Sequence, residues 1–189
     1  MSERPLIFGI GFPRTGTVSL GRALERLGWE VVHDFYRCQW LAQELIEQRL
    51  PSELSNASAT GGVAFLDGIW WKCAPLIRQW FPHAVLVHTS RPVEHWRVSM
   101  MIMQGAIMAS RRPIDEWTTI GQMTRDFEFF NALNRAYFSG DPRYVFLDLR
   151  HDKWGPLCDA LGCIAPDDEW PLTHTSDYLL QRIRKYQGA

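Results

Sequence analysis

A short loop rich in glycine and threonine, residues 11–17, carries the residues best suited to phosphate chemistry in this sequence, which reads Gly-Phe-Pro-Arg-Thr-Gly-Thr there. The apolar run 6–10 before the loop predicts a buried strand, and leucines and alanines at helical spacing follow it as far as Gly28. A strand–loop–helix junction directs backbone N–H groups and the positive end of a helix dipole at one place. We therefore expect an anionic diester or anhydride to bind there.

The cation of this loop is Arg14, whereas position 17, where a Mg-ATP-binding P-loop carries lysine, is Thr17. This pattern disfavours a Mg-ATP kinase. The run Pro-Arg-Thr-Gly-Thr-x-Ser-Leu resembles the 5′-phosphosulfate loop of P-loop sulfotransferases, in the short branch with Arg-Thr-Gly-Thr. The resemblance implies that the cofactor 3′-phosphoadenosine-5′-phosphosulfate (PAPS) is bound by the loop residues Pro13, Arg14, Thr15, Gly16, Thr17, Val18 and Ser19.

A second segment, 81–99, supports the same resemblance. It is an apolar strand that ends in Ser-Arg-Pro, and Pro92 is well placed to start a helix. Ser99 follows Arg91 by about two helical turns, so its hydroxyl can share one anion with the guanidinium. The pair resembles the family's 3′-phosphate site.

A third segment, 154–162, resembles the family's Trp-x-Pro-Leu-Cys-x-x-Leu-Gly helix, to which we assign a packing role. Together the three segments extend the resemblance over about residues 5–165.

The resemblance implies transfer of a sulfuryl group from PAPS to a hydroxyl or amine, without a metal ion. Arg14 stays charged at any ordinary pH, so its expected role is to stabilise the charge on the departing nucleotide. Asp67 is the first candidate for the base that accepts the acceptor's proton, at a position where better-known cytosolic sulfotransferases have a catalytic histidine. The competing pair is His33 and Asp34, although Asp34 is also suited to capping the next helix.

The acceptor pocket is expected to be apolar, with Trp70 and Trp71 as the first candidates to line it because they follow Asp67. Two alternatives to a sulfotransferase stay open. One is a nucleotide kinase on the same scaffold. The other is a non-catalytic protein that binds adenosine 3′,5′-bisphosphate.

The elements that must position these residues alternate along the chain. We predict strands over 5–11, 30–33, 62–67, 84–90 and 143–149, and helices over 16–27, 39–49, 72–80, 92–110, 114–139, 154–162 and 175–186. This alternation predicts an α/β fold, a three-layer P-loop-type parallel sheet with helices on both faces, as one domain over 1–189. Ligands then bind at the carboxyl ends of the strands. The polar stretch 51–62 is predicted to be a surface loop.

The composition and net charge of the chain limit the classes of partner that it is expected to bind. The 189 residues are 46% hydrophobic and carry a net charge of −1, so the chain can bury a core but has no basic run for a nucleic acid. Its four cysteines form no C-x-x-C pair, and no apolar stretch approaches the length of a membrane span. We expect a cytoplasmic protein with a small-molecule acceptor, no nucleic-acid or membrane partner, and a second copy of the chain as a further candidate partner.

Overall fold

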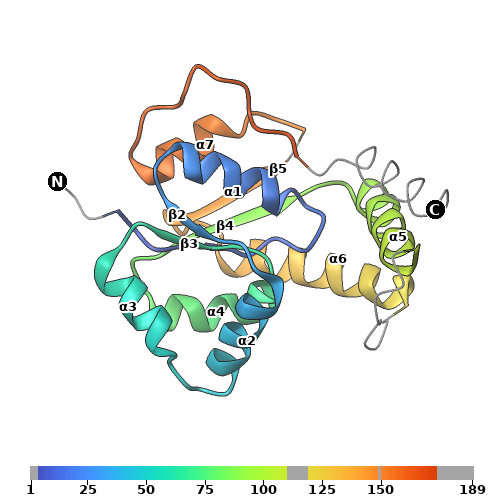
Figure 1. The fold of residues 1–189 in the computed structure, drawn as a ribbon, viewed down its shortest axis with the longest axis horizontal. Helices are drawn as coiled ribbons and strands as arrows, with labels where there is room; N and C mark the ends of the chain where they lie inside the picture. The colour runs from blue at the N-terminus through green and yellow to red at the C-terminus, as the bar shows by residue number, and fades with distance from the viewer. Residues whose placement is uncertain (1–3, 110–118, 149, 174–189) are drawn as a thin grey trace.

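The computed structural model describes residues 4–109, 119–148 and 150–173 (Figure 1). Their strands are β1 (Ile7–Gly9), β2 (Glu30–Val32), β3 (Val63–Phe65), β4 (Val85–Ser90) and β5 (Tyr144–Asp148). These pair in the order β2-β3-β1-β4-β5, and every pairing is parallel. The predicted parallel sheet is confirmed.

Helices cover both faces of this sheet. They are α1 (Thr17–Arg26), α2 (Phe35–Ile46), α3 (Ser52–Thr60), α4 (Trp70–Trp80), α5 (Val93–Ala109), α6 (Ile120–Tyr137) and α7 (Trp154–Leu161). Figure 1 shows α1 and α7 on one side of the sheet and α2, α3, α4 and α6 on the other. The predicted α/β fold with three layers is therefore confirmed.

The apolar runs of the strands explain the two main cores. Successive strand side chains point to opposite faces of a sheet. Phe8 accordingly packs in the cluster formed with α2 and α4, whereas its neighbour Ile7 packs in the cluster formed with α1 and α7. Burial on both faces is typical of a parallel sheet and leaves its carboxyl edge for ligand binding.

A third apolar cluster lies directly behind the glycine-rich loop. The ring of Phe12 stacks on Trp71 of α4 with 3.9 Å between centroids, and Trp96 of α5 stacks on Phe127 of α6 at 4.4 Å. The Nε1–H of Trp96 also donates to the carbonyl oxygen of Pro13 at 2.9 Å. Three helices therefore hold the loop in place from behind.

One predicted element is wrong. The stretch 51–62 contains helix α3 instead of a surface loop, because Leu54 and Ala57 are three residues apart and both are buried. Gly61, with φ of 67°, follows the last helical residue. The polar composition of the other positions only reflects the solvent-exposed side of this helix.

Two helices begin well away from their predicted first residues, 39 and 114. Helix α2 begins at Phe35 instead of 39, because the carboxylate of Asp34 accepts a hydrogen bond from the backbone N–H of Arg37 at 2.9 Å and caps the helix. Helix α6 begins at Ile120. The predicted helix at 175–186 lies outside the described residues. In the part of the chain that the structure describes, no helix is long and apolar enough to cross a membrane.

Gly11 permits the close approach of the loop to β4, which yields a stability prediction. A Cβ atom at this position would lie 2.6 Å from the carbonyl oxygen of Thr89 and 2.7 Å from Oγ1 of Thr15. We expect Gly11→Ala to destabilise the fold by about 1–3 kcal/mol, as overpacking does, measured by denaturant unfolding. Gly121→Ala is the matched control, because the nearest atom is 3.9 Å away and alanine favours a helix. Equal stability of the two variants would contradict the close packing at Gly11.

Candidate active site

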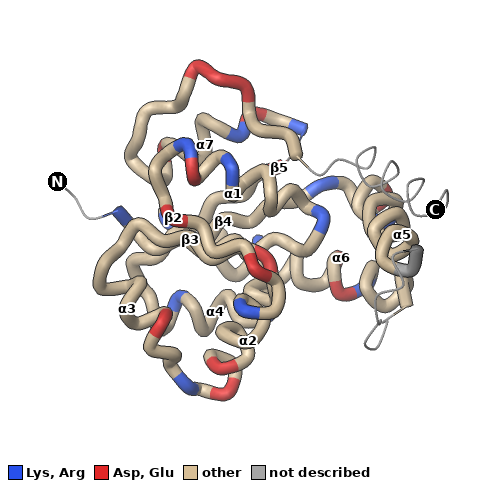
Figure 2. Tube along the Cα trace, in the orientation of Figure 1, with Lys and Arg blue, Asp and Glu red and all other residues tan. Residues whose placement is uncertain are grey.

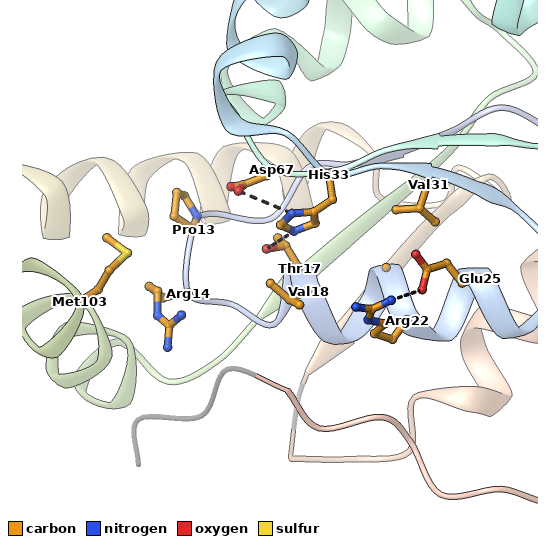
Figure 3. Close-up of a pocket in the computed structure, with 11 residues that line it drawn as sticks. Pro13, Arg14, Thr17, Val18, Arg22, Glu25, Val31, His33, Asp67 and Met103 are labelled. Atoms are coloured by element: carbon orange, nitrogen blue, oxygen red, sulfur yellow. Dashed lines mark hydrogen bonds and ion pairs between the residues drawn. The ribbon is translucent and has the colours of Figure 1, made fainter. Parts of the chain in front are cut away.

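A cavity of about 480 Å³ lies at the carboxyl ends of β1, β2 and β3, beside the glycine-rich loop (Figure 3). It is lined by Pro13, Arg14, Thr17, Val18, Gly21, Arg22, Glu25, Val31, His33, Asp67 and Met103. The loop, α1, the two strand ends and α5 all contribute to it. The candidate cation and both candidate bases therefore face the same space.

The N-terminus of α1 is built to bind an anion. Gly16 occupies the N-cap position in the left-handed conformation, with φ of 93°, and no described side chain caps the helix. The first N–H groups of a helix have no intrahelical acceptor, and they add to the positive end of the helix dipole. An anion at this position would supply the missing acceptors.

Two arginines and a buried serine converge beside this helix end. The Nε–H of Arg14 donates to Oγ of Ser99 at 3.1 Å. Burial lowers the pKa of Arg14, and the positive charge of Arg91 lowers it further. Burial also lowers the pKa of Arg91. Arg14 therefore contacts Ser99 and lies within electrostatic reach of Arg91, in one positively charged region that an anion would stabilise.

His33 and Asp67 form a pair on the other side of the cavity (Figure 3). The Nδ1 atom of His33 lies 4.0 Å from Oδ2 of Asp67, and its Nε2 lies 3.4 Å from Oγ1 of Thr17. Burial raises the pKa of Asp67, while the nearby His33 and Arg14 oppose that shift. A carboxylate with a raised pKa is a stronger base for a proton from a bound hydroxyl.

Backbone strain is concentrated at this cavity. Within the described ranges, the non-glycine residues with positive φ are Arg14 at 69°, Asp67 at 72° and Gln48. Two of these three line the cavity. Residues with a strained backbone are typical of functional sites. The surrounding fold holds such a residue in place, which fixes the direction of its side chain at a cost in stability.

Two of the predicted cofactor-binding residues make contacts within the protein. Thr15 is fully buried, and its hydroxyl donates to the carbonyl oxygen of Phe12 at 2.5 Å and contacts Oγ1 of Thr89 at 2.8 Å. Its hydroxyl therefore fixes the shape of the loop. Ser19 is also buried, and its Oγ accepts the backbone N–H of Thr173 at 3.2 Å, which ties the segment after α7 to α1.

The predicted acceptor-binding residues lie outside the cavity. Trp70 is fully buried against Phe8, and Trp71 is buried against Phe12. Both indoles support the sheet and loop, because α4 turns them toward the apolar core instead of toward the cavity. Asp34 caps α2. None of the three lines this cavity, and their assignment to the acceptor site stays a prediction.

The sequence interpretation also missed part of the cavity wall. Arg22 and Glu25 stand on the same side of α1 as the predicted Val18, and the guanidinium of Arg22 pairs with the Glu25 carboxylate at 2.8 Å. Their spacing is the signal that was available, because positions separated by three and four residues share one helix face. Met103 of α5 forms the opposite wall.

Comparison with known proteins identifies the family. Residues 6–145 match the model of a sulfotransferase domain, which covers most of the chain. The chain belongs to this sulfotransferase family. The family resemblance found in the sequence is thus confirmed, and the matched range contains the whole cavity wall together with Arg91 and Ser99.

A solved sulfotransferase structure has a similar fold. A crystal structure of a sulfotransferase from Alicyclobacillus acidocaldarius superposes with a TM-score of 0.56 at 12% sequence identity, over 98% of this chain and 95% of that chain. This likeness concerns the fold alone. A shikimate kinase from Bacteroides thetaiotaomicron aligns with the lower TM-score of 0.46 at 15% identity, over 98% of this chain and 99% of that chain. No curated protein matches the chain at a significant level.

Proposed function

We propose that this sulfotransferase moves a sulfuryl group from PAPS to a hydroxyl or amine of a small acceptor. The observation that carries the proposal is the anion-binding end of α1, which has Arg14 and Arg91 on one side and the His33–Asp67 pair on the other. Such an arrangement separates charge stabilisation from proton removal across one cavity. In-line group transfer needs both.

The residues present fit a donor with two anionic groups. The uncapped N–H groups of α1 and the Arg14 guanidinium suit the phosphosulfate, and Arg91 with Ser99 suits a second phosphate. Arg14 donates to Ser99 in the structure, so the two proposed anion sites adjoin each other. When bound, PAPS supplies the sulfuryl group and departs as adenosine 3′,5′-bisphosphate.

The roles of the protein groups follow from their charges. Arg14 remains a cation even with its lowered pKa, so it stabilises negative charge that develops beside the loop and does not transfer a proton. Asp67 accepts the proton of the acceptor hydroxyl or amine. His33, within 4.0 Å of that carboxylate, holds it in position and stabilises its charge.

Release of adenosine 3′,5′-bisphosphate tests this function. The protein is incubated with PAPS and a panel of phenols, aliphatic alcohols and amines, and the nucleotide product and the sulfated acceptor are quantified by mass spectrometry. We expect one product per nucleotide released for at least one acceptor class. Phosphorylated products from Mg-ATP with the same panel would instead support the kinase alternative, and nucleotide binding without any turnover would support the non-catalytic one.

Nucleotide selectivity provides a further prediction. We expect the protein to bind adenosine 3′,5′-bisphosphate more tightly than adenosine 5′-phosphate, and Arg91→Ala to reduce this preference by about tenfold to a hundredfold, the loss of one charge-assisted contact. Calorimetric titration of both nucleotides measures it. Arg97→Ala is the control, because Arg97 lies on α5 close after Arg91 in the chain but pairs with Glu94 at the surface. Equal affinity of the wild type for both nucleotides would contradict the assignment of Arg91.

A further inference from the structure

Two cysteines lie where α7 ends. The backbone N–H of Cys163 donates to the carbonyl oxygen of Cys158 at 3.0 Å. Gly162, in the left-handed conformation with φ of 63°, donates its N–H to the carbonyl oxygen of Asp159 at 3.3 Å. These two nested hydrogen bonds and the left-handed glycine form a Schellman motif, which turns the chain back over the last turn of the helix. Such a turn sets the side chain of its last residue against the side chain five positions earlier, here Cys163 against Cys158.

The backbone geometry brings the two cysteines within reach of a disulfide bond. The hydrogen bond of 3.0 Å between N of Cys163 and O of Cys158 limits their Cα atoms to a separation of about 7 Å for a straight path, and the bent path is shorter. Disulfides join Cα atoms that are about 4.4–6.8 Å apart. Both side chains pack in the same apolar cluster with α1. Burial and a hydrogen bond with the thiol of Cys163 raise the pKa of Cys158 to about 12, so the two thiols are in contact.

The cysteines of the chain differ in their access to solvent. Cys158 is buried, whereas Cys163 is only partly buried. Cys38 and Cys73 are buried, and each of these two thiols donates to a backbone carbonyl oxygen at 3.7 Å. Thiol–disulfide exchange begins at an accessible thiol. Cys163 is therefore the first thiol to react, and Cys158 lies beside it to complete the exchange.

Cys163 also begins an irregular segment that leads back to the candidate active site. We call residues 163–173 the strap, and Figure 1 shows it passing over α7 and α1. The Nε1–H of Trp154 donates to the carbonyl oxygen of Asp168 at 2.9 Å, and the backbone N–H of Thr173 donates to Oγ of Ser19 at 3.2 Å. Ser19 is one of the predicted cofactor-binding residues. The strap therefore connects the end of α7 with the loop side of α1.

The middle of the strap is held by exposed contacts. Residues 167–169 are acidic and exposed, and Figure 2 shows acidic residues along the outer bend of the strap. Arg26 donates to the carbonyl oxygen of Glu169 at 3.0 Å and lies 3.9 Å from the carboxylate of Asp168, at the surface. Exposed ion pairs contribute little to stability. A covalent bond at Cys163 would add a constraint that these contacts do not provide.

We propose that Cys158 and Cys163 form a reversible dithiol–disulfide couple, which in its oxidised form fixes the start of the strap to α7. The oxidant is a small disulfide such as glutathione disulfide. The thiolate of Cys163 attacks one sulfur atom of this disulfide and releases one small thiol, which leaves a mixed disulfide. The sulfur of Cys158 then loses its proton, attacks Sγ of Cys163 and releases the second small thiol. The two cysteines thus lose two electrons and two protons, and the small disulfide gains both.

Glutathione disulfide tests this couple in the intact protein. Both cysteines lie in one tryptic peptide, residues 154–182, so the bond makes this peptide lighter by two hydrogen atoms and prevents its alkylation by iodoacetamide. We expect full conversion in excess glutathione disulfide and full reversal by dithiothreitol. The thermal midpoint of the oxidised protein should rise by a few degrees. Cys38 and Cys73 should stay reduced, as alkylation after unfolding would show.

Single substitutions separate a disulfide from two independent thiols. Cys158→Ala should stop at the mixed disulfide, so that Cys163 gains one glutathione. Cys163→Ala should stay reduced, because the remaining thiols are buried. Cys73→Ala is the matched control and should form the bond as the wild type does. A wild type that stays reduced, or that keeps glutathione on Cys163, would overturn the couple, and this result decides the proposal even where a variant does not fold.

Discussion

Asp67→Asn is expected to lower the rate of sulfuryl transfer by about a hundredfold to ten-thousandfold, the range for loss of a general base. The amide keeps the shape of the side chain but cannot accept the proton of the acceptor. Adenosine 3′,5′-bisphosphate affinity should stay within a few-fold of the wild type, because Asp67 lies across the cavity from the arginines. Steady-state kinetics with a working acceptor and calorimetry with the nucleotide provide the two measurements.

Neighbouring residues provide the controls for Asp67. Asp34→Asn should have little effect, because Asp34 lies outside the cavity and asparagine also caps helices. His33→Gln should reduce turnover less than Asp67→Asn, because His33 acts through the carboxylate. If His33→Gln stops sulfuryl transfer and Asp67→Asn only weakens acceptor binding, the roles are exchanged, with His33 as the base.

The pH dependence of activity follows from the same carboxyl group. Burial raises the pKa of Asp67 above that of an ordinary aspartate, and only the deprotonated form accepts a proton. The value of kcat/KM should therefore fall as the pH drops through this raised pKa. The residual activity of Asp67→Asn should lack that acidic limb. An identical acidic limb in the variant would assign the titration to another group.

Arg14→Ala is expected to slow turnover by about a hundredfold to a thousandfold, the usual loss for one group that stabilises charge in the transition state. The nucleotide affinity should change less, because Arg91 and the end of α1 remain. Arg14→Lys should keep much of the activity, since it restores the charge but not the planar group that contacts Ser99. Turnover that is insensitive to Arg14→Ala would show that the loop cation is structural.

Much of the fold could be predicted because its signals are local. Most strands of the sheet lie in apolar runs, and the junction at Gly16 combines a strand, a tight turn and a helix start within a few residues. Helix α3 was missed because only Leu54 and Ala57 face the core, which leaves too weak a pattern in a polar stretch. Local composition thus predicts central elements better than peripheral ones.

Several residues of the candidate site could be predicted from the sequence, but their arrangement in space could not. His33 and Asp67 were expected as competing bases, whereas the pairing of Val32 with Phe65 brings the two strand ends together and makes them one pair. The burial of Trp70 depends on how α4 turns against the sheet, which its sequence position does not reveal. Long-range contacts of this kind arise only from tertiary packing.

Calorimetric titration with adenosine 3′,5′-bisphosphate, set against Mg-ATP, tests the proposed function most directly, because it needs no knowledge of the acceptor. The anion site at α1 and the Arg91–Ser99 site together predict tight binding of the bisphosphate without added metal, and much weaker binding of Mg-ATP. Stronger binding of Mg-ATP, or no binding of the bisphosphate, would contradict a PAPS-dependent sulfotransferase.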